Sequence, residues 1–165
     1  MLLYRVFPYL DSAKAGEAGH PLYVHPAQGK DRWDNPSAYL AWYMASERNS
    51  AVAAVFAQLS MWRDTMFPFP QIPGSRRALG IYRLPDELPY VDLPQTFVDR
   101  GMRPSQVVER NRPYTQGKAL EIYNEKRWNA IRWWSFTVRT GASGACGRSI
   151  RPARPSKPSM SPTQP

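Results

Sequence analysis

Short apolar stretches separated by prolines and glycines run along the chain, and each predicts one secondary-structure element. The first, Leu2–Phe7, is apolar and aromatic and ends at Pro8, which indicates a strand. A second dense aromatic stretch, Ala38–Met44, also favours a strand. Further strands are predicted over residues 21–25, 77–84 and 131–136.

Two longer stretches have their apolar residues at helical spacing. The first runs from about residue 47 to 59, with Ser46 as the expected N-cap, and the second covers residues 115–125. Short helical turns are expected near residues 96–100 and 104–109, between prolines that break the rest of this region. The mixed order of strands and helices predicts a compact α+β domain, a mixed sheet with flanking helices.

Composition changes sharply after residue 136. The remaining residues hold five basic and no acidic side chains, together with five prolines and five serines. Such a segment buries too little apolar surface to offset the entropy lost on ordering. We therefore predict one ordered domain over residues 1–136 and a disordered basic C-terminal tail over residues 137–165.

The net charge of +9 on 165 residues suggests a polyanionic partner. More than half of that charge lies in the expected tail, however, which leaves 17 basic against 13 acidic residues before it. The run Arg132–Trp134 resembles a patch on which bases stack. Neighbouring strand residues point to opposite faces, so one of its two tryptophans belongs to the core. Direct nucleic-acid binding by the ordered domain is therefore not expected.

Three further features bear on location and metal chemistry. No apolar run is long enough to span a bilayer, and the first residues lack a secretory pattern. The single cysteine, Cys146, fits a reducing compartment, so we predict a cytoplasmic protein. His20 and His25 are the two histidines, and no further ligands stand at fixed spacing around them, so no metal site is predicted.

Four polar residues stand at predicted strand ends or in a tight loop: Arg5, Arg32, Tyr43 and Ser135. Each alone is compatible with a structural role. Together they suit a diphosphate joined to a base and a sugar. Guanidinium groups bind phosphate oxygens through paired hydrogen bonds, and a tyrosine ring stacks on a flat heterocycle.

The order and spacing of these pieces resemble the RES domain, the toxin of a bacterial toxin–antitoxin pair, over about residues 2–136. The family is named for an arginine, a glutamate and a serine. The segments that carry the likeness are Tyr4–Phe7, Gly29–Pro36 with Arg32, Tyr43–Ser46, Ser50–Phe56, Thr115–Gln116 and Arg132–Ser135.

The resemblance implies an ADP-ribosyltransferase-like fold with a cleft for NAD as substrate. It also implies cleavage or transfer at the nicotinamide–ribose bond, and a small DNA-binding antitoxin as partner. Carried over to this chain, Arg5 and Arg32 hold the NAD phosphates. Tyr43 packs near the nicotinamide ribose, and Ser135 forms a hydrogen bond with the substrate.

One departure concerns the family's glutamate, expected eleven residues after the tyrosine, where this chain has Ala54. Positive charge grows on the ribose as the bond breaks, and a nearby carboxylate stabilises it. Glu47 stands seven residues earlier, about 10 Å along a helix axis, too far to substitute. We therefore expect an impaired NAD-cleaving toxin domain. The alternatives are an inactive RES-like module that binds nucleotide or an antitoxin, and a basic nucleic-acid-binding protein.

A second departure is the end of the chain. After Ser135 the sequence turns to Arg, Pro, Ser and Gly, residues that a GC-rich gene tends to encode out of frame. This composition suggests the hypothesis that residues after about 137 replace the ancestral C-terminus.

Overall fold

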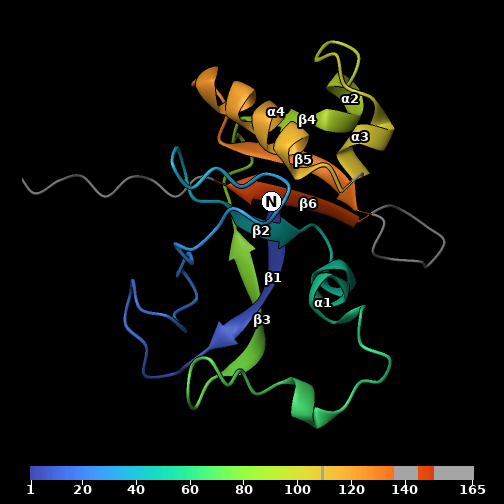
Figure 1. The fold of residues 1–165 in the computed structure, drawn as a ribbon. Helices are drawn as coiled ribbons and strands as arrows, with labels where there is room; N and C mark the ends of the chain where they lie inside the picture. Colours follow the sequence, from blue (N-terminus) through green and yellow to red (C-terminus); the bar gives the residue numbers. More distant parts are fainter. Residues whose placement is uncertain (109, 136–144, 151–165) are drawn as a thin grey trace, which may run out of the picture.

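The computed structural model describes residues 1–108, 110–135 and 145–150, with side chains described up to Val107 and from Arg110 to Trp134 (Figure 1). One six-stranded sheet has the strand order β3-β1-β2-β6-β5-β4, antiparallel except for the β4–β5 pair. The strands are β1 (Leu2–Tyr9), β2 (Trp42–Ala45), β3 (Arg76–Arg83), β4 (Tyr90–Asp92), β5 (Ala130–Ser135) and β6 (Ala145–Ile150). The helices are α1 (Arg48–Phe56), α2 (Leu93–Thr96), α3 (Pro104–Val108) and α4 (Arg112–Asn124), with a 3-10 turn at Asp64–Met66. The predicted α+β class is confirmed.

Strands β1 and β3 form the longest antiparallel pair, in register from Leu2 opposite Arg83 to Tyr9 opposite Arg76. The predicted first strand therefore continues through Pro8 instead of ending there. Pairing of β1 with β2 is centred on Tyr4, so one side of β1 is open at Pro8, where proline is tolerated. Gly80 on β3 is also required, because a Cβ there would lie 2.7 Å from the Tyr82 ring.

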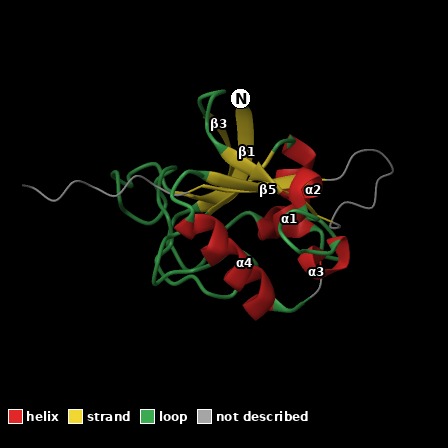
Figure 2. Ribbon diagram, turned by 90° about the horizontal axis from the view of Figure 1, so that it is seen from above, coloured by secondary structure: helices red, strands yellow, loops and turns green. Residues whose placement is uncertain are grey.

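The sheet has two differently covered faces. Tyr4 lies opposite Ala45, so Tyr43 shares their face, while Met44 points to the other. Figure 2 shows α1, α3 and α4 on one side of the strands. The main core lies there and includes Trp33, Val107, Ala119, Ile122 and Trp133. Leu3, Met44 and Ala130 form a smaller core on the opposite face, beside Trp42 and Tyr82.

Several predicted boundaries are wrong. Residues 21–25 form turns and loop instead of a strand. The strand expected from Ala38 begins at Trp42, because the backbone first turns, with Tyr39 N–H donating to the carbonyl of Asn35. Helix α1 begins at Arg48, with Glu47 as its N-cap and no side-chain cap, so Ser46 does not have the predicted capping role. The short strand β4 was not predicted.

The predicted disorder of the C-terminal segment is wrong for residues 145–150. These residues form β6, which pairs with β2 on one side and with β5 on the other. The other residues of the expected tail, 137–144 and 151–165, lie outside the described residues. A segment expected to contribute nothing therefore joins the two halves of the sheet, and the ordered part does not end at residue 136.

No helix among the described residues has both the length and the apolar character needed to cross a membrane.

Candidate functional site

The loop before β2 is organised around the carboxylate of Asp34, which is only 3% exposed. Its Oδ2 accepts hydrogen bonds of 2.8 Å from the backbone N–H groups of Gly29 and Asp31. Its Oδ1 accepts a hydrogen bond of 2.8 Å from the hydroxyl of Tyr43. Gly29 has φ +130°, a backbone conformation that residues other than glycine rarely adopt. This buried carboxylate therefore closes the loop and fixes it to β2.

Tyr43 is held from two directions. Its hydroxyl donates to Asp34 and accepts a hydrogen bond of 3.1 Å from the backbone N–H of Trp33. Its ring meets Trp133 edge to face, with centroids 5.9 Å apart. Burial, followed by the negative charge of Asp34, raises the pKa of Tyr43, so the hydroxyl stays protonated at neutral pH. Both hydrogen bonds of the Tyr43 hydroxyl are thus made with residues of the loop.

Helices α3 and α4 hold the other side of this loop. Gln116 Nε2 donates to the carbonyls of Gly29 and Asp31, at 3.0 and 2.8 Å. Arg32 Nη1 donates to the carbonyl of Val107 at 2.5 Å, and Asn35 Nδ2 donates to the carbonyl of Gln116 at 3.0 Å. The predicted residue Arg32 therefore lies between β2 and the start of α4.

A second arginine lies beside Arg32. Burial lowers the pKa of Arg32, and the positive charge of Arg112 lowers it further, while Tyr43 and Asp31 act in the opposite direction. Nη1 of Arg112 is buried and has no hydrogen-bond partner among the described residues. Burial and the charge of Asp34 raise the pKa of Asp31, while both arginines oppose this rise. The guanidinium groups of Arg32 and Arg112 therefore lie close together, with Arg32 near Tyr43. Within the described part of the chain, the Nη1 donor of Arg112 is unsatisfied.

Arg112 was not singled out from the sequence. It stands in a polar stretch ending at Pro113 with no motif around it, and only the folding of α4 against the loop brings it to Arg32. Asn111 caps this helix, its side chain accepting from the N–H of Tyr114 at 3.2 Å. The available sequence signal was the position of Arg112 directly before Pro113, because a proline near the start of a helix indicates where that helix begins.

The structure does not bring Arg5 to Arg32 and Tyr43. Arg5 is next to Tyr4 on β1, so strand alternation places it on the opposite face of the sheet from Tyr43. There its Nη1 donates to the carbonyl of Tyr23 at 3.2 Å. Burial lowers the pKa of Arg5, and contact with Tyr82 opposes this shift. Arg5 therefore braces the loop that covers the smaller core.

The other predicted site residues lie on α1 and β5. Ala54 is exposed on α1, one turn after the buried Ser50 and Ala51, so a longer side chain fits there without displacing core. Glu47, the other carboxylate considered for this role, is exposed at the N-terminal end of the same helix. Ser135 is the last residue of β5, and its side chain lies outside the described residues.

The two histidines make local contacts. Nδ1 of His20 accepts a hydrogen bond from the N–H of Leu22, and Nδ1 of His25 accepts one from the N–H of Ala27. In the ranges that the structure describes, no group of three or more histidine, cysteine or acidic side chains is placed to hold a metal ion.

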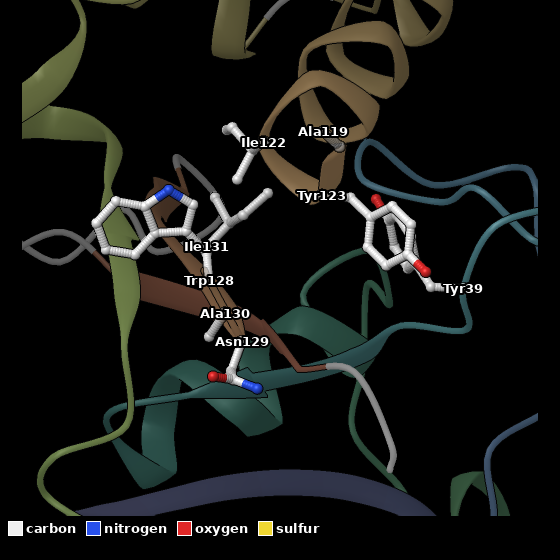
Figure 3. A pocket seen from close by; sticks show the side chains of 8 residues that line it. All are labelled: Tyr39, Ala119, Ile122, Tyr123, Trp128, Asn129, Ala130 and Ile131. Atoms are coloured by element: carbon white, nitrogen blue, oxygen red, sulfur yellow. The ribbon is translucent and has the colours of Figure 1, made fainter. Parts of the chain in front are cut away.

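A small apolar cavity lies between α4 and β5 (Figure 3). The stacked rings of Tyr39 and Tyr123, with centroids 4.9 Å apart, lie on one side and Trp128 on the other. Its volume of about 30 Å³ holds one or two water molecules at most. This cavity is therefore too small for a nucleotide.

A family model of the RES domain matches residues 2–153. The match includes the loop with Arg32, the strand with Tyr43 and strand β6, and it continues past residue 136, where the likeness was expected to end. No curated protein and no solved structure matches the chain. Because the family match spans nearly the whole sequence, the chain belongs to the RES domain family.

Proposed function

We propose that this chain is the RES-type toxin domain of a toxin–antitoxin pair and that it binds NAD beside Arg32 and Arg112. The observation that carries the proposal is the pair of neighbouring guanidinium groups, one with a buried and unsatisfied Nη1. Such a pair suits a diphosphate, because each phosphate oxygen can accept from a guanidinium fork. Arg112 thus takes the place that sequence reasoning gave to Arg5.

The neighbouring residues support a nucleotide more than a free phosphate. Tyr43 presents a ring held rigidly by Asp34 and Trp133, which suits packing against a ribose or a flat base. Asp31 is exposed beside the two arginines, and its carboxylate offsets part of their positive charge. Arriving phosphates then compete with Asp31 for the guanidinium groups.

Cleavage of the nicotinamide–ribose bond requires more than binding. The bond breaks towards an oxocarbenium-like transition state, which a carboxylate near the ribose stabilises. Asp34 does not fill this role, because its two oxygens already accept three hydrogen bonds within the loop. With Ala54 at the glutamate position, the proposed enzyme binds NAD but turns it over slowly.

The proposal includes a small DNA-binding antitoxin as partner, and membership of the RES domain family supports this part of the proposal. The second candidate function is a module that binds nucleotide or antitoxin without catalysis, and Ala54 is the specific observation that favours it. The first candidate consumes NAD, whereas the second consumes none.

The test pairs NAD binding by calorimetry with NAD consumption. We expect the wild-type chain to bind NAD and consume it slowly, and Ala54→Glu to consume it faster, by about 100-fold if the carboxylate supplies about 3 kcal/mol. Arg112→Gln is expected to weaken binding by about tenfold through loss of a charged hydrogen bond. The matched control is Arg103→Gln, an exposed arginine outside the loop.

Rapid wild-type consumption that Ala54→Glu leaves unchanged contradicts the assigned role of position 54. Equal NAD affinity in wild type and Arg112→Gln contradicts the placement of the diphosphate. Binding without consumption in both wild type and Ala54→Glu selects the non-catalytic module.

A further inference from the structure

A hollow of about 450 Å³ opens at the C-terminal end of α1. It lies within the range of about 300–1,000 Å³ that binding sites occupy. We call it the α1 hollow. Its walls come from the end of α1, the following loop and the start of β3, and include Val55, Leu59, Met61, Arg63, Met66 and Arg77. The hollow is therefore large enough to receive two or three side chains of another molecule.

The rim of the α1 hollow is unusually apolar for a protein surface. Val55, Leu59, Met61 and Trp62 are 40%, 44%, 61% and 59% exposed. Trp62 lies beside the buried ring of Phe56, with centroids 6.1 Å apart. Val55, Leu59 and Met61 line the hollow, and Trp62 adjoins it through its contact with Phe56. A single exposed apolar residue is ordinary, but such a group within eight residues is typical of an interaction surface.

Two arginines give the α1 hollow a positive charge. Arg77 Nη1 donates to the carbonyl of Met66 at 2.5 Å, and the guanidinium lies over the Phe56 and Phe69 rings, 5.6 and 5.1 Å from their centroids. Arg63 contacts the sulfur of Met61 at 3.8 Å. Neither arginine forms an ion pair within the part of the chain that the structure describes. Both are therefore available to a carboxylate from outside.

This charge selects among possible occupants. The chain's own residues 151–165 contain Arg151, Arg154 and Lys157 and no acidic residue, so they are repelled from the arginines. A second copy bound through the same surface would bring four arginines into one interface, and no acidic residue in the described part of the chain lines the hollow to offset them. An acidic segment with large apolar side chains satisfies both the apolar walls and the two arginines.

We infer that the α1 hollow is a docking site for an acidic peptide segment of a partner protein, which inserts apolar side chains and places carboxylates on Arg63 and Arg77. The apolar side chains fill the space beside Val55 and Leu59. The Arg77 guanidinium is already held in place by the Phe56 and Phe69 rings, so it loses little conformational freedom when it pairs with a carboxylate.

The experiment pans a phage-displayed library of random peptides on the immobilised full chain, then measures binding of selected synthetic peptides by fluorescence anisotropy. We expect selected peptides to combine aromatic or aliphatic residues with Asp or Glu. Leu59→Asp and Arg63→Glu, both at exposed positions, are expected to weaken binding by about tenfold or more. Val98→Asp and Arg103→Glu make the same chemical changes at exposed sites elsewhere and are expected to leave binding unchanged.

A further arm replaces the acidic residues of a selected peptide with lysine. We expect this peptide to lose affinity for the wild-type chain and to regain it with Arg63→Glu. The proposal is overturned if selected peptides lack acidic residues, or if Leu59→Asp and Arg63→Glu bind as tightly as wild type. It is also overturned if sedimentation shows a wild-type dimer that Leu59→Asp dissociates, because the occupant is then a second copy.

Discussion

Asp34 illustrates how one buried carboxylate can organise a loop. Burying a carboxylate that is only 3% exposed costs free energy unless it is paired or hydrogen-bonded. Here two backbone N–H groups and one hydroxyl donate to it. The sequence showed this residue only as a neighbour of Arg32. Its role depends on the turn at Gly29, which brings the N–H groups of Gly29 and Asp31 to the carboxylate of Asp34.

Removing the Tyr43 hydroxyl tests this arrangement. Tyr43→Phe leaves Asp34 Oδ1 without its donor and the N–H of Trp33 without its acceptor, both in a buried loop. We expect a loss of about 1–3 kcal/mol in the free energy of unfolding, measured by urea denaturation. Tyr9→Phe is the control, because Tyr9 is exposed and bonded to the exposed Asp11, so its expected change is below about 0.5 kcal/mol. Equal losses in the two variants would argue against a special role for the loop.

At the scale of elements, sequence patterns located those elements whose apolar residues face a core. Helix α4, strand β3 and strand β5 each lie within one to three residues of their predicted positions. The strand expected over residues 21–25 is absent because that segment instead supplies carbonyls, from Pro21 to Tyr82 and from Tyr23 to Arg5. Such a role depends on tertiary partners and leaves no local pattern.

In the candidate site too, residues within local sequence patterns were predicted, and a residue that depends on tertiary packing was not. Arg32 and Tyr43 were found because they lie in a recognisable loop and strand end, and the structure brings them together. Arg5 was assigned to the same site from its residue type, although strand alternation places it on the other face. Arg112 was missed because its proximity to Arg32 arises only from the packing of α4 against the loop.

The end of α4 carries a pH-dependent connection to the segment after α2. Arg100 donates to Glu125 at 2.6 Å, and this bond, joined by those from Trp128 and Arg127, lowers the pKa of Glu125 to about 2. The ordinary value is 4.5, so the stabilisation is complete above about pH 4.5 and is lost as the pH falls towards 2.

We therefore expect Glu125→Gln to lose less stability than wild type between pH 5 and pH 2, measured as the urea midpoint at each pH. Glu121→Gln, a more exposed glutamate on the same helix that pairs with Lys118, serves as the control and should follow the wild-type profile. Superimposable profiles for wild type and Glu125→Gln would contradict the assignment.

At the scale of the whole molecule, the net charge of +9 does not describe one surface. Arg32 and Arg112 converge on one loop, whereas Arg63 and Arg77 flank a separate apolar hollow. Arg100, Arg127 and Arg132 are already paired with Glu125 or Asp92. The basic character is therefore divided among small sites and ion pairs.

The sheet as a whole depends on β6. Without it, β3, β1 and β2 form one group and β5 and β4 another, each with a new open edge. We expect a chain ending at residue 144 to show a lower thermal midpoint and stronger binding of an apolar dye than a chain ending at residue 153, where the family match ends. Identical melting of the two chains would show that β6 is dispensable.

This position of β6 has a consequence for how the protein is made. Trp42 pairs with Ile150, so β2 is synthesised long before the strand that becomes its neighbour. While the chain emerges from the ribosome, β2 and β5 stay open to chaperones, to proteases and to other nascent chains. The central pairing can therefore form only after β6 has been synthesised, and any message that stops before β6 yields a chain that cannot close its sheet.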